Sequence, residues 1–186
     1  TRGQEWTQDA SGVPDSAETG DQFGYALSAW NYGNGFRSDL AIGVPFEDVL
    51  STSTDTQQID AGAVNLIYGS LSGLNTTDHP AQFWTQDSPG VPEDSEGEDE
   101  FGAALAAGDL NDDGAADLAV GVPGEDVGSA SDAGAVNVIY GSAGGLSDAG
   151  NQLWTQNSVG AGESSESGDR FGAAVASGDF NHDGFA

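Results

Sequence analysis

The chain has 186 residues and carries 31 Asp and Glu against three Arg and no Lys, which gives a formal charge of −28. This balance excludes nucleic acid and anionic membrane surfaces as partners, because both are bound through cationic side chains. The chain has no Cys for disulfides or thiolate metal sites, and no apolar run long enough to insert into a membrane.

Short β-strands are predicted along the whole chain, because aliphatic and β-branched runs alternate with Gly and Pro turns and no stretch has helical periodicity. In chain order, the predicted strands are residues 4–8, 23–30, 38–44, 62–69, 82–86, 101–108, 117–122, 134–141, 152–156 and 171–178. The connections 9–22, 87–100 and 157–170 are acidic and rich in Gly and Ser, and we expect them to be exposed.

The predicted strands form a repeat. Gln4-Glu5-Trp6-Thr7-Gln8 recurs at residues 82–86 and 152–156, at intervals of 78 and then 70 residues, and a Phe-Gly pair follows each copy. The recurring Trp is predicted to pack between units rather than to serve as a carbohydrate platform, because a buried Trp removes a large apolar area from water. The repeat divides the chain into residues 1–22, the end of a preceding unit; 23–100, unit 1; 101–170, unit 2; and 171–186, the start of a further unit.

Four antiparallel strands repeated at a fixed period are the building plan of a β-propeller blade. We therefore predict an all-β fold of propeller blades, each with four antiparallel strands. A β-solenoid or a β-sandwich would contain similar strands, but the long period and the Gly-Pro pattern favour the propeller. Closed propellers use about four to eight blades. The two units here therefore predict an incomplete propeller, with open blade edges through which chains could associate.

An acidic loop separates the first two predicted strands of unit 2. Its first, third, fifth and ninth positions carry oxygen side chains and its sixth is glycine: Asp109, Asn111, Asp113, Asp117 and Gly114. Alternating oxygens before a glycine suit a hard cation, because the loop must curl its ligands inward. An EF-hand or dockerin loop is excluded, since its twelfth position would be Val120. An Asx-rich turn without an ion is the remaining alternative.

The Phe-Gly and Gly-Val-Pro segments, with this acidic loop between them, resemble the FG-GAP repeat of integrin α-subunit propellers and of bacterial secreted proteins. The resemblance covers essentially the whole chain and is strongest to the bacterial versions, which share the Gly-Glu-Asp-Val and Tyr-Gly-Ser segments. In that family the loop binds calcium. The resemblance implies side-chain ligation by Asp109, Asn111, Asp113 and Asp117, and ligation by the backbone carbonyl of Ala115.

The equivalent loops of the other units depart from this pattern. In unit 1 the same positions read Asn31, Gly33, Gly35, Arg37 and Asp39. Three ligands are lost and a cation is gained, so this loop is predicted to bind no calcium; the retained Asp39 indicates a structural role for the closing Asp. The third loop is predicted to be a second, incomplete calcium loop, because the chain stops before its ninth position: Asp179, Asn181, Asp183 and Phe185.

No catalytic residue is predicted. The chain has no Lys, no Cys nucleophile and no Gly-x-Ser-x-Gly elbow, and no carboxylate pair suited to glycoside hydrolysis stands out from the repeat. The sequence therefore predicts a non-catalytic, calcium-stabilised binding or adhesion scaffold, secreted or at the surface of a bacterial cell, with a protein or carbohydrate ligand. Two alternatives are the propeller module of a secreted enzyme and a structural, filament-forming surface protein.

Overall fold

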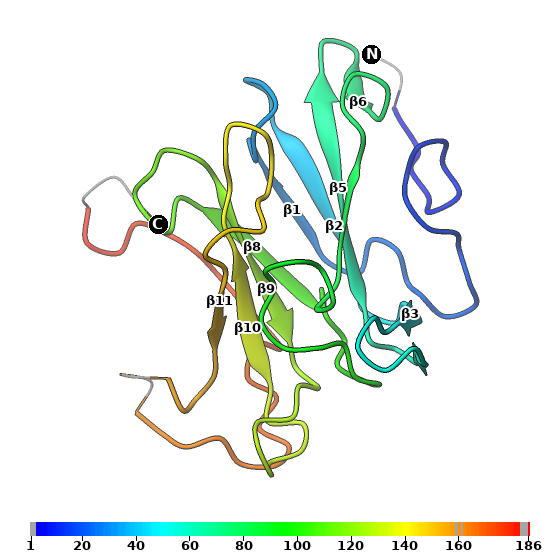
Figure 1. Cartoon of the computed structure of the whole chain (residues 1–186). Helices are drawn as coiled ribbons and strands as arrows, with labels where there is room; N and C mark the ends of the chain where they lie inside the picture. Colours follow the sequence, from blue (N-terminus) through cyan, green and yellow to red (C-terminus); the bar gives the residue numbers. More distant parts are fainter. Residues whose placement is uncertain (1–2, 159, 161, 183–185) are drawn as a thin grey trace.

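A computed structural model describes residues 3–158, 160, 162–182 and 186 (Figure 1). The described residues contain strands and loops but no helix, which confirms the all-β prediction. The strands are β1 (Leu27–Trp30), β2 (Asp39–Val44), β3 (Val49–Leu50), β4 (Gln57–Gln58), β5 (Ala63–Ser70), β6 (Gly73–Asn75), β7 (Gln82–Trp84), β8 (Ala104–Gly108), β9 (Asp117–Val122), β10 (Ala135–Ile139) and β11 (Gln152–Trp154).

The two repeat units form two antiparallel sheets that stand side by side (Figure 1). In unit 1 the order is β1-β2-β5, with β7 and the short β6 both paired to β5. In unit 2 the order is β8-β9-β10-β11. Unit 2 is therefore a four-stranded meander, as predicted for a propeller blade, and unit 1 is the same meander with the short β6 as a fifth strand. Within the described residues the sheets do not close into a ring, in keeping with an incomplete propeller.

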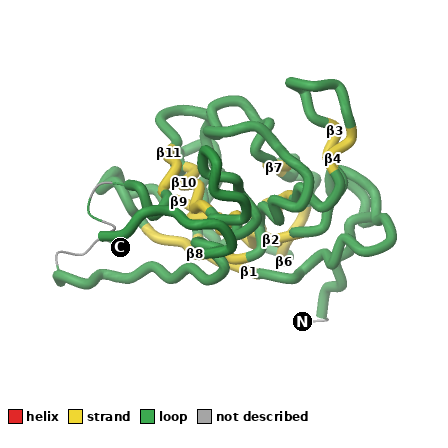
Figure 2. Tube along the Cα trace, turned by 90° about the horizontal axis from the view of Figure 1, so that it is seen from below, coloured by secondary structure: helices red, strands yellow, loops and turns green. Residues whose placement is uncertain are grey.

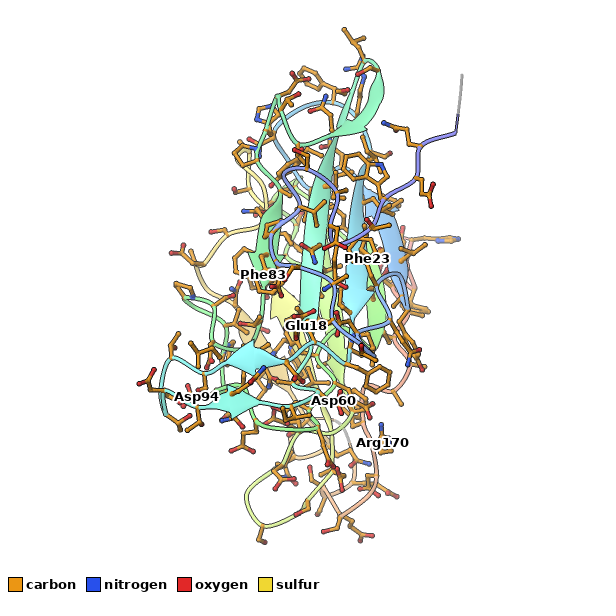
Figure 3. The ribbon with its side chains drawn as sticks, turned by 90° about the vertical axis from the view of Figure 1, so that its right-hand side faces the viewer. Glu18, Phe23, Asp60, Phe83, Asp94 and Arg170 are labelled. Carbon is orange, nitrogen blue, oxygen red and sulfur yellow. The ribbon has the colours of Figure 1, made fainter. Side chains whose placement is uncertain are left out.

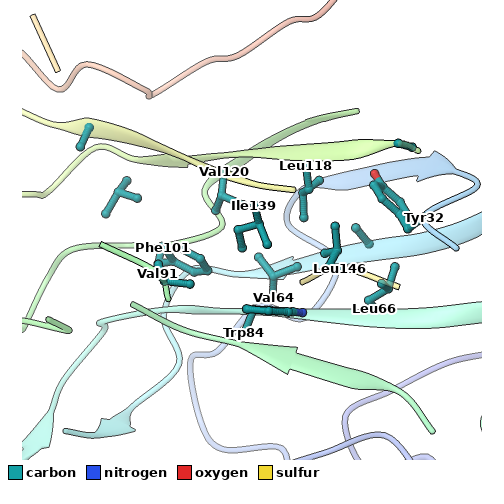
Figure 4. Packing of buried hydrophobic residues seen from close by; sticks show 14 of the residues in the cluster. Tyr32, Val64, Leu66, Trp84, Val91, Phe101, Leu118, Val120, Ile139 and Leu146 are labelled. Atoms are coloured by element: carbon teal, nitrogen blue, oxygen red, sulfur yellow. The ribbon is translucent and has the colours of Figure 1, made fainter. Parts of the chain in front are cut away.

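The main hydrophobic core lies between the two sheets (Figure 4). Successive side chains of a strand point to opposite faces, so alternate residues of each sheet meet in this layer. Unit 1 contributes Val64, Leu66 and Trp84, while unit 2 contributes residues such as Leu118 and Ile139. Neither sheet could bury this face alone, so stacking of the units supplies the apolar burial that stabilises both.

A smaller core covers the opposite face of unit 1, where Val13, Ile42 and Ile67 are buried and Trp6 and Phe23 pack against them. Trp6 and Trp84 therefore pack against the units that follow them, as predicted. Trp154, the third copy, is 44% exposed.

The Phe-Gly pair attaches each unit to the one before it. The amide of Phe101 donates to the carbonyl of Ala61 (2.9 Å), and that of Phe171 donates to Ala133 (2.8 Å) in the same way. Gly102 follows with φ 92°, a left-handed conformation that glycine adopts without strain. This turn is the reason that β8 begins at Ala104 rather than at Phe101.

Two predicted strands do not form: residues 4–8 and 171–178 contain no strand in the described structure, and only Phe171 makes an isolated bridge, to Gly134. A strand requires hydrogen bonds from a neighbour. In the two units the equivalent segments, β7 and β8, pair with β5 and β9, and the described residues contain no counterpart of those two strands for residues 4–8 or 171–178. Strands β3, β4 and β6 were not predicted, because they are only two or three residues long and too short to show an alternating pattern.

The long acidic connections are loops (Figure 2). Asp60, Asp94 and Arg170 lie toward the same end of the sheets, the lower end in Figure 3. There Arg170 Nη2 contacts Glu100 Oε2 at 2.6 Å, an ion pair that links the loops leading into unit 2 and into residues 171–186. The Arg170 amide also donates to the Asp132 carbonyl of unit 2 (3.0 Å).

Candidate metal centre

The acidic loop of unit 2 connects β8 to β9 and gathers three of its predicted ligands. Asp109 Oδ1 and Asn111 Oδ1 both accept from the amide of Asp113, at 3.2 and 3.0 Å. Asn111 Nδ2 donates to Asp113 Oδ2 (3.1 Å), and Asp109 Oδ2 accepts from the amide of Gly114 (2.9 Å). Two oxygens that share one N–H donor must lie close together. The side chains at positions one, three and five therefore converge at the exposed end of the loop.

Asp117, the predicted closing ligand, is placed differently. It is fully buried at the start of β9, where its Oδ2 accepts from the amide of Leu110 (2.7 Å) and its Oδ1 from the amide of Gly141 (2.8 Å). Burial raises the pKa of the Asp117 carboxyl, and the two amide donors oppose that rise. Asp117 thus ties the loop to the end of the third strand of its own sheet.

Asp39 makes the same two bonds in unit 1. Its Oδ2 accepts from the amide of Tyr32 (2.8 Å) and its Oδ1 from the amide of Gly69 (2.8 Å), and its side chain is buried. This geometry confirms the structural role inferred for the closing Asp, and it explains why Asp39 is present in a loop that lacks the other ligands.

The three loops share a backbone turn. Their fourth residues, Asn34, Asp112 and His182, have φ of 58°, 64° and 66°. The turn of unit 1 forms with glycine at the third and fifth positions, held by Asn31 Oδ1, which accepts from the Gly33 amide (3.2 Å). Oxygen-bearing side chains at those positions are therefore not needed to make the turn. The presence of Asn111 and Asp113 there in the loop of unit 2 calls for a different explanation.

The third loop is described only in part. Asp179 Oδ1 accepts from the amide of His182 (2.5 Å), while the predicted ligands Asp183 and Phe185 lie outside the described residues. The amide of Ala186 donates to the carbonyl of Asp109 (3.0 Å), so the C-terminal residue lies beside the loop of unit 2 (Figure 1).

Across residues 3–158, 160, 162–182 and 186, no three His, Asp or Glu side chains are gathered closely enough to hold a metal ion. A cation in the loop of unit 2 would therefore need donors of mixed type. The loop offers the carboxylates of Asp109 and Asp113, the amide oxygen of Asn111 and the carbonyl of Ala115. An all-oxygen set of this kind fits calcium, which binds six to eight oxygens at about 2.3–2.6 Å and accepts water among them.

A second group of carboxyls lies at the junction between the units. Glu125 Oε2 accepts from Gln86 Nε2 (2.5 Å), and both side chains are buried. Asp99 is also buried, and its Oδ2 accepts from the amide of Glu96 (2.7 Å). Burial, reinforced by neighbouring carboxylates that include Asp126, raises the pKa of Glu125 to about 7 and that of Asp99 to about 8.

Stability is therefore expected to fall as the pH rises. The folded pKa values of Glu125 and Asp99 exceed the ordinary values of 4.5 and 3.8, so the folded state binds these protons more tightly than the unfolded state. The contribution of the two groups to the free energy of unfolding is most favourable below about pH 4, and it is lost as the pH rises through about 7 to 8. Thermal melts from pH 5 to 9 should show this decline, and Asp99→Asn should flatten it. Identical pH profiles for Asp99→Asn and the exposed control Asp94→Asn would contradict this assignment.

Comparison with known proteins agrees with the fold and with the position of the loop. Residues 101–139 match the FG-GAP repeat, and this segment contains β8, the acidic loop, β9 and β10. The chain is also 32% identical over 121 residues to phosphatidylinositol-glycan-specific phospholipase D of Rattus norvegicus. That alignment covers 65% of this chain and 13% of the rat protein, so the chain corresponds to a small part of that relative.

In the part of the chain that the structure describes, no helical segment has the length and apolarity needed to cross a bilayer. The matched segment contains the Phe-Gly turn, three of the four strands of the unit 2 sheet and the acidic loop between β8 and β9. Residues 101–139 of this chain are an FG-GAP repeat.

Proposed function

We propose that the chain is a non-catalytic, calcium-stabilised scaffold of FG-GAP blades that presents a binding or adhesion surface outside the cell. The convergence of Asp109, Asn111 and Asp113 within the FG-GAP segment carries this proposal. Without a cation, the carboxylates of this loop repel one another; calcium would remove that repulsion and hold the turn between β8 and β9. The blades would then present their exposed loops to a protein or carbohydrate ligand.

A secreted or cell-surface location in a bacterium is part of the same proposal. FG-GAP repeats are typical of extracellular proteins, and residues 101–139 are such a repeat. A net charge of −28 favours solubility and argues against nucleic acid as a partner. Calcium is abundant enough outside cells to fill sites with dissociation constants of about 10⁻⁴–10⁻³ M, as extracellular modules do.

Removal of calcium is expected to destabilise the protein through the loop of unit 2. A ligand that binds only the folded state contributes about 2.7 kcal/mol at a hundredfold excess over its Kd. Chelator should therefore lower the melting temperature of the wild-type chain but have little effect on Asp113→Ala. The matched control is Asp112→Asn, which removes a neighbouring charge at the exposed fourth position and keeps a residue that tolerates φ 64°. An equal response to chelator in Asp113→Ala and wild type would contradict the proposal.

A second candidate is that the chain is a non-catalytic module of an enzyme. The similarity to part of a phospholipase D favours it, since the alignment covers only 13% of that protein. The chain by itself should then have no phospholipase activity, while the longer protein that contains it should be active. Hydrolysis of a glycosylated phosphatidylinositol substrate by residues 1–186 alone would contradict both candidates.

A further inference from the structure

Buried carboxyl groups meet an amide side chain at the junction between units 1 and 2. The side chains of Gln86, Asp99 and Glu125 are 1%, 1% and 4% exposed. Gln86 Nε2 donates to Glu125 Oε2 (2.5 Å), and the amide of Gly124 donates to the carbonyl of Asp99 (3.0 Å). We call these three side chains the junction site. Glu125 follows the end of β9, whereas the acidic loop precedes its start, so the two sites lie at opposite ends of that strand.

One oxygen of the junction site has no hydrogen-bond partner. Gln86 Oε1 is buried and unpaired among the residues that the structure describes. It belongs to the same amide group as Nε2, which donates to Glu125, so it lies beside the Glu125 carboxyl. A buried polar atom without a protein partner calls for a bound water or ion.

Cationic side chains are too few to neutralise the buried carboxyl groups. The chain has three Arg and no Lys. Arg170 pairs with Glu100 (2.6 Å), and Arg37 lies in the loop between β1 and β2. Burial first, and then neighbouring carboxylates that include Glu125, raise the pKa of Asp99. Buried carboxylates are ordinarily paired with a cationic side chain or bound to a metal ion, so a bound cation is the remaining source of positive charge.

The junction between residues 1–22 and unit 1 is built in the same way. Gln8 Nε2 donates to Glu47 Oε2 (2.6 Å), and the side chains of Gln8, Asp21 and Glu47 are buried. Burial, followed by a hydrogen bond with the carboxyl of Asp15, raises the pKa of Glu47 to about 9. Two carboxyl groups in contact cannot both be ionised unless a cation lies between them. The arrangement is therefore a property of the repeat.

We propose that the junction site binds a hard divalent cation, with calcium as the ion that fits, through Gln86 Oε1 and the carboxylates of Asp99 and Glu125. Calcium takes oxygen ligands and accepts a mixed set that water completes. The ion supplies the missing partner of Gln86 Oε1, while Nε2 keeps its bond to Glu125. It also takes the place of the protons of the empty site, so the pH dependence expected above applies to the protein without bound cation.

Calcium counting by equilibrium dialysis separates the junction site from the acidic loop. At saturating calcium, Glu125→Gln should bind one ion fewer than wild type, Asp113→Ala one fewer, and the double variant two fewer. Glu5→Gln, an exposed control, should bind as many ions as wild type. Glu125→Gln keeps an acceptor for Gln86 Nε2 and the shape of the protonated acid, so in chelator it should melt no lower than wild type.

Anomalous diffraction from calcium-bound crystals should show an ion within about 2.3–2.6 Å of Gln86 Oε1 and of carboxylate oxygens of Asp99 and Glu125. An equal calcium count in Glu125→Gln and wild type would overturn the proposal, as would a water molecule in place of the ion. Loss of one ion in Glu125→Gln but none in Asp113→Ala would support the junction site and reject the loop. If Glu125→Gln does not fold, Asp99→Asn makes the same comparison.

Discussion

Asp39→Ala is expected to lower the free energy of unfolding by about 2–5 kcal/mol, although Asp39 belongs to a loop predicted to bind no metal. The substitution removes the acceptor of the Tyr32 and Gly69 amides and leaves both donors inside the structure. An unsatisfied buried donor costs about 1–3 kcal/mol, and here two are created. Urea denaturation of wild type and variant would measure the loss.

The control for this prediction is Asp94→Ala, which removes an exposed carboxylate from a loop and should change stability by less than about 0.5 kcal/mol. The loss in Asp39→Ala should be the same in calcium and in chelator. A loss that appeared only in calcium would show that Asp39 acts through a bound cation and would contradict the structural role.

Gly43→Ala is expected to destabilise the protein by about 3 kcal/mol or more, at the upper end of the cost of overpacking. A Cβ atom at Gly43 in β2 would overlap the carbonyl oxygen of Gly102, in the Phe-Gly turn of unit 2. The obstacle is backbone, which cannot rotate away, so the two units would have to separate. Gly121 in β9 faces Gly172 in the same way, so the contact belongs to the repeat.

Gly35→Ala is the matched control, because Gly35 is exposed and a Cβ there would meet no atom within 4 Å. Thermal melts of the two variants should differ by several degrees. If Gly43→Ala and Gly35→Ala have the same melting temperature, the close approach of the Phe-Gly turn to β2 does not limit the packing of the units.

The blade architecture could be predicted from the sequence because its signals are local. Aliphatic runs such as residues 117–122 form strands, and the repeat fixes their order. Residues 4–8 and 171–178 carry the same strand pattern but form none, because a strand depends on a partner that local sequence does not show. The hairpin of β3 and β4 was missed for the opposite reason: Gln57 and Gln58 pair through their backbones and have no apolar pattern.

The candidate site was predictable to a similar extent. The alternation of Asp109, Asn111 and Asp113 indicated that their oxygens would converge, and in the structure they do. The structural role of the closing Asp had one sequence signal, which was the retention of Asp39 in the loop of unit 1. The contacts of Gln8 with Glu47 and of Gln86 with Glu125 were not predicted, although these residues recur in register. Recurrence shows that a residue is repeated, but Gln86 and Glu125 are 39 positions apart and only the folded chain shows that they touch.

Calcium-bound diffraction tests the central claim most directly. Crystals grown with saturating calcium should show anomalous density in the loop of unit 2, within about 2.3–2.6 Å of oxygens from Asp109, Asn111 and Asp113. The equivalent position between Asn31 and Asp39 should show none. A loop of unit 2 that remains free of calcium under these conditions, with its side chains still bonded only to their own backbone, would show that it is an Asx-rich turn and would contradict the account.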